Sequence, residues 1–256
     1  KLYEITGNKT IVQFQSIIHP VMNFQSANYL SNVGEIENKG IELSIGLQLV
    51  DTKDWNVRLN ASYNTNHNKV LSIGNAVPFA IGGFSSRTVQ TVVAEGEPVG
   101  FIRGYKAVLN PDNSLKEILP LQNLGSTLPT AYGNFSLSAS YKNLSFMLSG
   151  DYQYGAYVHS FDRQFRFSKG LKDDAIPEKA LEGLDQGANW LNFTNFFVEK
   201  SDFLKIRNIG IAYDYKPKKY LKSVNLAFNV YNPFAFTASS VDPEAALAGA
   251  SRTRNF

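Results

Sequence analysis

The sequence predicts an all-β fold, a transmembrane antiparallel β-barrel, of which this chain forms one part. Three observations lead to this prediction: strict alternation of apolar and polar residues, strand lengths suited to a membrane, and short turns that alternate with long loops. Alternation with a period of two is typical of a strand whose two faces meet different surroundings. About ten such residues let a tilted strand cross the ~25 Å apolar band of an outer membrane. We therefore expect the apolar face to lie against lipid and the polar face against a watery lumen.

The composition excludes several other classes of protein. The 256-residue chain has no cysteine, which excludes a disulfide framework and any cysteine-based metal or nucleophilic site. The sequence contains no apolar run long enough for a transmembrane helix. The formal net charge is +3 and the Lys and Arg residues are scattered, so we expect no nucleic-acid partner.

The first part of the chain leads into the clearest hairpin. Residues Lys1–Thr6 are typical of the end of a strand, and residues 7–35 are predicted to form an irregular extracellular loop broken by Pro20. Strands are expected over residues 36–50 and 55–72. Their alternating apolar residues are Ile41, Leu43, Ile45, Leu47, Leu49, Trp55, Val57, Leu59, Ala61 and Tyr63.

A long extracellular loop follows over residues 74–131, where Gly and Pro recur throughout. It has room for a possible short strand pair, over residues 88–93 and 99–108. A second hairpin is expected over residues 132–142 and 143–157, because apolar residues again alternate with Asn, Ser and Gln on both sides of a short turn. At this turn Asn143 follows Lys142, and Asn tolerates the positive φ that a two-residue turn requires.

The last third of the chain repeats this arrangement. A loop over residues 158–201 includes a possible short helix near residues 177–184. The third hairpin is expected over residues 203–216 and 222–232, with a basic turn between them. A phase shift between Ile206 and Ile209 suggests a β-bulge in its first strand. Residues 233–252 are predicted to be a loop.

The three hairpin turns are short and the segments between the hairpins are long. Outer-membrane barrels have short periplasmic turns and long extracellular loops. We therefore place the turns at Asp51, Lys142 and Pro217 in the periplasm. The chain begins at Lys1 without a Met or a leader, and Arg252–Phe256 is typical of the start of a strand. Both ends suggest a piece of a larger protein.

Five stretches, in order, resemble motifs of SusC-like TonB-dependent transporters (the RagA/SusC family) of Bacteroidetes outer membranes. Each stretch alone is a weak match, but together they cover nearly the whole chain. They are Asn32–Leu43, Glu95–Lys106, Pro129–Lys142, Phe197–Asn208, and Asn232–Phe234 with Asp242–Glu244.

This resemblance implies the C-terminal third of a 22-stranded barrel, without the plug domain that precedes it. It also implies TonB-dependent active import of oligosaccharides, or of peptides in some members, together with a SusD-like surface lipoprotein. TonB would act through the plug. The implied location is the bacterial outer membrane, with lipid around the barrel.

The aromatic residues fall into two groups. Those at strand ends are expected to form interfacial girdles: Trp55, Tyr63, Tyr141, Tyr154, Tyr213 and Tyr215. Those in the long loops lie close to charged residues, and such a combination can bind a sugar ring or a peptide. The candidate substrate-binding residues are Phe84, Arg87, Phe161, Arg163 and Trp190.

No catalytic, metal or cofactor site is predicted. His19, His67 and His159 are far apart and lack the Ser and Asp neighbours that a hydrolase needs. Between Leu109 and Pro129, where the family often has an Asp-rich stretch, only Asn110–Asn113 remains, so we expect no metal.

Two other functions stay open. One is a passive or structural small outer-membrane barrel, which is disfavoured because small barrels fill their interior with side chains and Asn and Ser fill it poorly. The other is a barrel hydrolase, which the scattered histidines disfavour. A plug domain encoded upstream would separate the importer from both.

Overall fold

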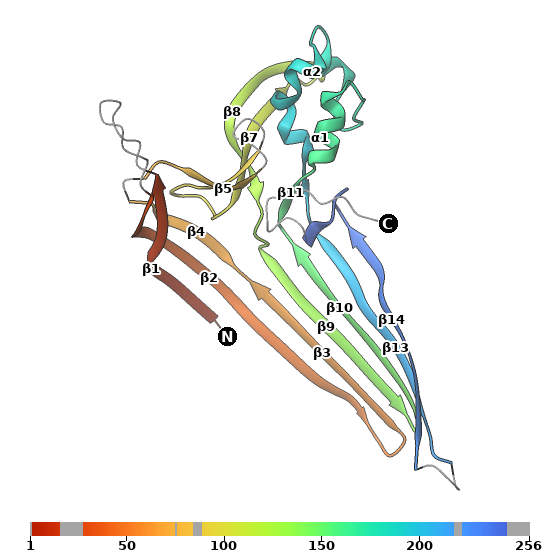
Figure 1. The fold of residues 1–256 in the computed structure, drawn as a ribbon. Helices are drawn as coiled ribbons and strands as arrows, with labels where there is room; N and C mark the ends of the chain where they lie inside the picture. The colour runs from red at the N-terminus through yellow and green to blue at the C-terminus, as the bar shows by residue number, and fades with distance from the viewer. Residues whose placement is uncertain (1, 16–27, 75, 84–88, 218–221, 245–256) are drawn as a thin grey trace.

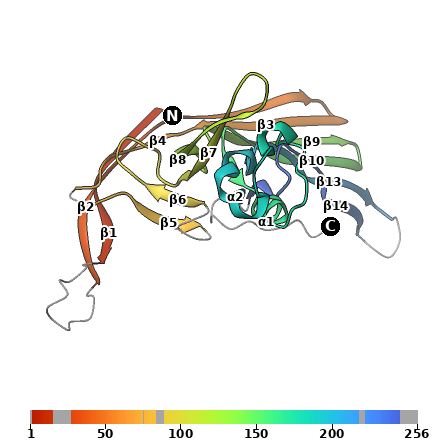
Figure 2. The same ribbon diagram turned by 90° about the horizontal axis from the view of Figure 1, so that it is seen from above.

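The computed structural model describes residues 2–15, 28–74, 76–83, 89–217 and 222–244, with side chains from Gly34 onward. Within these residues, one large antiparallel sheet has the strand order β1–β2–β3–β9–β10–β13–β14, and β4 also pairs with β2 (Figure 1). Seen from above, its strands form an open arc with the helices inside the curve (Figure 2). The strands of this sheet are β1 (Leu2–Gln15), β2 (Asn28–Asp51), β3 (Trp55–Thr65), β4 (His67–Ser72), β9 (Ala131–Tyr141), β10 (Leu144–Tyr154), β13 (Phe203–Tyr215) and β14 (Val224–Thr237).

The predicted alternation produces continuous rows of apolar side chains across the sheet. Leu47 pairs with Leu59, Leu59 with Leu137, and Leu137 with Leu148. On β2 the five apolar side chains from Ile41 to Leu49 are 45–54% exposed. An apolar face left uncovered over a whole sheet is not a soluble core. It is the face expected to lie against lipid, and the all-β barrel architecture predicted from the sequence is confirmed.

Aromatic residues mark the two ends of this apolar face. At one end the rings of Trp55 and Tyr141 lie 4.5 Å apart. At the other end Tyr63 lies on the same face of β3, eight residues further along. Eight residues of strand extend roughly 26 Å, which at a tilt of about 40° is about 20 Å along the membrane normal. This separation suits two aromatic girdles on either side of the apolar band.

The structure corrects the irregular loop expected over residues 7–35. Most of this segment is strand, and β1 pairs with β2 from Leu2 opposite Ile41 to Gln15 opposite Asn28. Both strands extend beyond the alternating apolar row, where neither face has to be apolar and the pairing depends on backbone hydrogen bonds. The sequence pattern therefore does not mark these strands. Pro20 lies outside the described residues.

The third hairpin contains the bulge that the sequence indicates. Against the neighbouring strand β10, the register of β13 shifts between Ile206 and Asn208, so that Arg207 is the extra residue. β14 also continues to Thr237, beyond the expected end at residue 232, although Pro233 lies within it. Within the described residues β14 pairs only with β13, and an edge strand tolerates a proline because one side needs no backbone donor.

The hairpin turn between β9 and β10 has the expected place but a different conformation. Its positive φ, 51°, belongs to Lys142 and not to Asn143. The basic turn of the third hairpin falls partly on residues 218–221, outside the described part of the chain.

The segment 74–131 contains more strand than expected. It forms a four-stranded antiparallel sheet of β5 (Phe79–Gly83), β6 (Gln90–Val93), β7 (Phe101–Leu109) and β8 (Leu115–Ser126). The predicted short pair corresponds to β6 and β7, whereas β5 and β8 were missed. β8 includes Pro120 and a left-handed Leu121 (φ 53°), which read as loop signals in the sequence.

Three asparagines join this upper sheet to the main one. The side-chain oxygen of Asn38 accepts hydrogen bonds from Asn66 (3.3 Å) and Asn68 (2.8 Å). The side-chain oxygen of Asn68 in turn accepts from the backbone N–H of Val99 at 2.7 Å. Asn38 and Val99 belong to two of the family-like motifs, so these motifs meet in space.

The segment 158–201 is mainly helical, which exceeds the single short helix expected near residues 177–184. It begins and ends in the strand pair β11 (Tyr157–His159) and β12 (Val198–Lys200). Between them lie α1 (Phe161–Ser168), η1 (Glu178–Leu181), α2 (Gln186–Asn189) and η2 (Trp190–Phe197). In the described residues no helix is long and apolar enough to cross a membrane.

Candidate functional site

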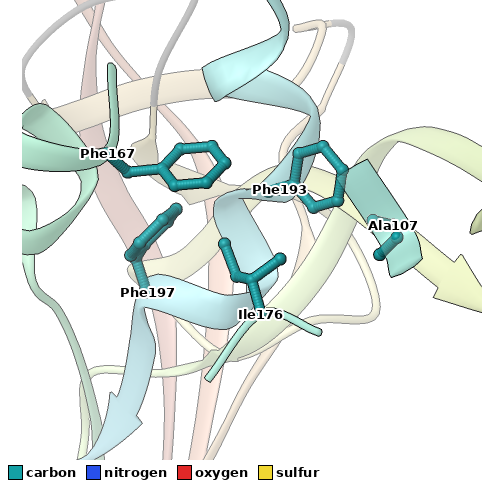
Figure 3. Packing of buried hydrophobic residues seen from close by; sticks show 6 residues of the cluster. Ala107, Phe167, Ile176, Phe193 and Phe197 are labelled. Carbon is teal, nitrogen blue, oxygen red and sulfur yellow. The ribbon is translucent and has the colours of Figure 1, made fainter. Parts of the chain in front are cut away.

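The hairpin β7–β8 and the helical segment pack together into a unit that we call the cap. Its core consists of buried residues from both parts of the chain (Figure 3): Ala107, Phe167, Ile176, Ala180, Phe193 and Phe197. The rings of Phe167 and Phe197 lie 5.5 Å apart, and Phe193 meets Phe167 edge to face at 5.8 Å. This core is separate from the main sheet and holds two long, loop-like segments in one arrangement.

A close backbone approach joins the two parts of the cap. Gly104 of β7 lies against Thr194 of η2, and a Cβ at this glycine would be 2.8 Å from a Thr194 methyl carbon. The side chain of Asn195 also accepts a hydrogen bond from the backbone N–H of Ala107 at 2.8 Å. Glycine at position 104 therefore permits the contact on which the cap depends.

α1 is short and carries its buried residues on one side. Gln164 and Phe167 are buried, while Asp162, Phe165 and Arg166 are exposed. The helix ends at Ser168, with Lys169 as its C-cap residue, and Gly170 follows with φ 82°, a left-handed conformation that favours glycine. α1 thus presents a charged ridge toward solvent and anchors itself on the cap core.

A buried polar chain connects α1 to η2 and to the strand pair below it. A ring nitrogen of His159 lies 2.6 Å from the side-chain oxygen of Gln164. The side-chain nitrogen of Gln164 donates a hydrogen bond to Thr194 Oγ1 at 3.0 Å. Burial lowers the pKa of His159 from 6.5 to about 4, despite the opposing effects of Gln164 and Glu199. The imidazole is therefore neutral at ordinary pH and donates to the Gln164 oxygen.

Arg163 is held by two carboxylates. It forms a two-point ion pair with Asp173 and a third contact with Glu199, and its guanidinium lies 5.7 Å from the Phe197 ring centre. Partial burial opposes the charged form, but Asp173 and Glu199 together raise the pKa of Arg163 above its usual value. The network fixes α1 to the segment before η1 and to β12.

The segment after β14 forms a strap over this site, which we define as residues 239–244. The backbone N–H and the hydroxyl of Ser240 donate to Glu199. Further on, Glu244 contacts both Lys205 and Arg207 of β13, while Asp242 lies 3.3 Å from Lys205. The strap is thus fixed to the cap at one end and to the main sheet at the other.

The strap attaches at the bulge of β13. The bulge residue Arg207 pairs with Asp151 on the neighbouring strand as well as with Glu244. Lys205 is only 7% exposed, and Asp242 and Glu244 are the carboxylates that balance its buried ammonium. Partial burial would raise the pKa of Glu244, but Arg207 and Lys205 lower it below its usual value.

A pocket of about 570 Å³ lies between α1, the segment 172–175 and the strap. Most of its lining is charged or polar: Asp162, Arg163, Arg166, Lys172, Asp173 and Asp174, with Ser160 and Ser240 at one side. Its volume falls in the range of roughly 300–1,000 Å³ usual for ligand pockets. We take this pocket as the candidate site.

A second depression, of about 480 Å³, lies on the polar face of the main sheet. Small side chains leave it open, among them Ser138, Ser140, Ser145 and Ala212, together with Gly210. It is a feature of the lumen wall.

The structure brings some of the candidate residues together. Phe161 and Arg163 both lie on α1, and Arg163 lines the pocket. Trp190 instead packs against the cap core. Phe84 and Arg87 lie outside the described residues. The role of these residues in substrate binding stays a prediction.

The sequence reasoning missed several lining residues. Arg166, Lys172, Asp173 and Asp174 were not among the candidates, although two basic and two acidic residues fall within nine positions. Such a cluster in a loop was the available signal. Among the described residues, no group of three or more His, Asp or Glu side chains is placed to hold a metal ion.

Comparisons with known proteins place the chain among outer-membrane receptors. The family model described as "TonB dependent receptor-like, beta-barrel" matches residues 6–233. TonB-dependent receptor P39 of Formosa agariphila is 33% identical over 82 residues, covering 31% of this chain and 7% of that protein. TonB-dependent receptor SusC of Bacteroides thetaiotaomicron is 23% identical over 272 residues, covering 92% of this chain and 27% of SusC.

Solved structures show the same fold. The RagAB peptide importer in its "closed-closed" state superposes with a TM-score of 0.71 at 20% identity, over 95% of this chain and 30% of that one. The chain therefore spans less than a third of the length of these relatives.

Proposed function

We propose, because the chain belongs to the TonB-dependent receptor β-barrel family, that it forms the C-terminal part of the barrel of a SusC-like active importer. Members of this family are outer-membrane β-barrel proteins. The observation that carries the proposal is the sheet itself, whose apolar rows end in aromatic residues and whose long loops build a cap at one end. A barrel wall with a loop-built entrance on one side suits uptake through the lumen.

The proposed cargo is an oligosaccharide, with a peptide as the alternative. One relative is named SusC, and the solved RagAB structures are described as a peptide transporter and importer. We also propose a SusD-like surface lipoprotein as the partner that delivers cargo to the cap side. The plug and the segment that contacts TonB would belong to the rest of a longer polypeptide.

In this mechanism the chain makes and breaks no covalent bond. Cargo would reach the cap, where the pocket and the charged ridge of α1 face solvent. It would then pass along the polar face of β3, β9, β10 and β13 once TonB displaces the plug. Asn and Ser on that face offer hydrogen bonds without the strong binding that would hold cargo in the channel.

The test is uptake of cargo by intact cells that carry the complete transporter gene. Labelled gluco-oligosaccharides and a labelled peptide mixture would be supplied to cells with and without TonB, and with and without a protonophore. We expect uptake of one of the two cargo classes to disappear when TonB or the proton-motive force is removed. Uptake that continues unchanged would instead indicate a passive barrel.

The partner is tested by native mass measurement on the purified transporter. A complex of the full-length chain with a lipoprotein is expected. A lone species near 28 kDa, the mass of this chain, would contradict both the importer and its partner.

A further inference from the structure

We propose that the pocket between α1 and the strap binds a small zwitterionic ligand, a group that carries an ammonium and a carboxylate, such as a short peptide with free ends. This inference deepens the peptide alternative of the proposed function, and it rests on the proposed function only for the direction of transport. It rests on which charges of the pocket are already paired and which remain open.

The charged side chains at the floor of the pocket are paired with other charged groups of the protein. Arg163 and Asp173 bind each other at two points, and Glu199 completes the pairing of Arg163. Lys172, which lines the pocket, lies 2.7 Å from Glu178, which does not. Arg163 and Asp173 therefore form a fixed base with little free charge to offer a ligand, and the exposed Lys172 has its charge matched by Glu178.

At the rim of the pocket, on the exposed side of α1, the charged side chains are not paired with others that the structure describes. Among the described residues, the side chains of Asp162 and Arg166 form no ion pair or hydrogen bond with another side chain, and both line the pocket. They lie one helical turn apart on the same side of α1, where side chains are neighbours. Across the pocket, Asp174 adds a second carboxylate beside Lys172. The open charges are therefore one cation and two anions.

This arrangement discriminates between ligand classes. A ligand with only negative charge would be repelled by Asp162 and Asp174, and a ligand with only positive charge would be repelled by Arg166. A ligand with both charges satisfies all three groups, and the guanidinium fork suits a carboxylate in particular. Among the described residues no aromatic side chain lines the pocket, so they offer the apolar face of a neutral sugar ring no flat surface on which to stack.

The strap forms one wall of the same pocket through Ser240 and Val241. A ligand that fills the pocket would therefore touch α1 and the strap together. Glu244 ties the strap to Lys205 and Arg207 on β13, and Ser240 ties it to Glu199, so the strap itself connects the pocket to the barrel wall. This places the ligand at the junction of the cap and the barrel.

The experiment measures binding by calorimetry on the complete transporter in detergent. The probes are trialanine with free ends, trialanine amide with a free amino end, N-acetyl-trialanine amide with both ends blocked, and maltotriose as a neutral sugar of similar size. We expect trialanine to bind and the doubly blocked peptide to bind at least tenfold more weakly. Maltotriose should not compete with trialanine.

Two variants assign the contacts, and one serves as a control. Arg166→Gln should weaken trialanine at least tenfold but should not weaken trialanine amide, because the amide lacks the carboxylate and is repelled by Arg166. Asp162→Asn should weaken both. Lys169→Gln, on the same helix but with its ammonium 5.1 Å from the Phe165 ring centre and outside the lining, should change neither.

Several outcomes would overturn the inference: trialanine fails to bind, the blocked peptide binds as well as the free one, or Arg166→Gln has no effect. Maltotriose binding that is lost in Arg166→Gln would assign the pocket to sugars instead. These outcomes leave TonB-dependent uptake intact if the proposed function is correct. Loss of energised uptake with normal trialanine binding would contradict the function and not the pocket.

Discussion

His159 is a single residue whose protonation opposes the closed cap. Its pKa in the folded protein is about 4, below the usual 6.5 of an exposed histidine, because burial disfavours the charged form. When the cap opens, the ring regains its usual pKa and takes up a proton at mildly acid pH. The closed cap should therefore lose stability as the pH falls from about 6.5 to about 4, and be insensitive to this group above 6.5.

Hydrogen exchange of the α1 amides in the complete protein measures this effect. The comparison is with His159→Gln, which keeps a side chain able to hydrogen-bond and removes the titration. The ratio of the wild-type exchange rate to the variant exchange rate should rise at least tenfold as the pH falls from 6.5 to 4.5, since each pKa unit corresponds to about 1.4 kcal/mol. A flat ratio would show that His159 does not control the opening.

Gly150 is a second residue with a specific requirement. A Cβ at this position would lie 2.5 Å from the Lys205 carbonyl oxygen and 2.5 Å from a carbon of the Phe135 ring, which is opposite Gly150 on β9. Gly150→Ala should destabilise the barrel by about 1–3 kcal/mol through overpacking. Gly46→Ala is the control, because its nearest contact is the flexible side-chain oxygen of Asn60 at 3.2 Å. The measurement is the urea concentration at which the folded band on unheated gels is lost, and equal midpoints would contradict the prediction.

At the scale of strands, the paired rows give the depth of each lipid-facing residue. Leu47 and Leu59 pair in the middle row, halfway between the rows of Trp55 and Tyr63, and Ile45 lies one row away. Leu226 pairs with Tyr213 and so lies at the level of an aromatic girdle. Arginine at Leu47 or Ile45 should cost about 2–4 kcal/mol, and at Leu226 only about 0–1 kcal/mol.

The matched control is Asn60→Arg, on the polar face of β3 between Leu59 and Ala61 and opposite Gly46, which should be nearly neutral. Urea titration of each variant in a defined bilayer measures the difference. If arginine on both faces had the same cost, the assignment of the lipid face would be wrong.

The strands were predictable to the extent that their two faces differ. Period-two alternation indicated the three hairpins, and the phase change around Arg207 indicated the bulge. β1 and the first half of β2 gave no such signal, and β8 carries Pro120 within the strand. The pocket was less predictable still, because Asp162, Asp174 and Ser240 come together only through contacts between segments far apart in the sequence.

For the whole molecule, the separation of the two apolar regions has a testable result. Phe193 is fully buried in the cap core and does not contact the lipid-facing rows. Phe193→Ala should destabilise the cap by about 3–5 kcal/mol and leave the barrel folded. The cap would then be cut by an external protease on intact cells, while the unheated gel band stays unchanged. Loss of both together would show that cap and barrel form a single cooperative unit.

The composition of the cap also sets an order of events during assembly. Ala107 and Phe193 stand 86 positions apart, and the strands β9 and β10 lie between them in the chain. A cap that packed before the β9–β10 hairpin spanned the bilayer would have to cross with it as a folded unit, so we expect the contact to form once both segments have reached the outer side. Protease resistance of the cap loops would then report the completion of insertion.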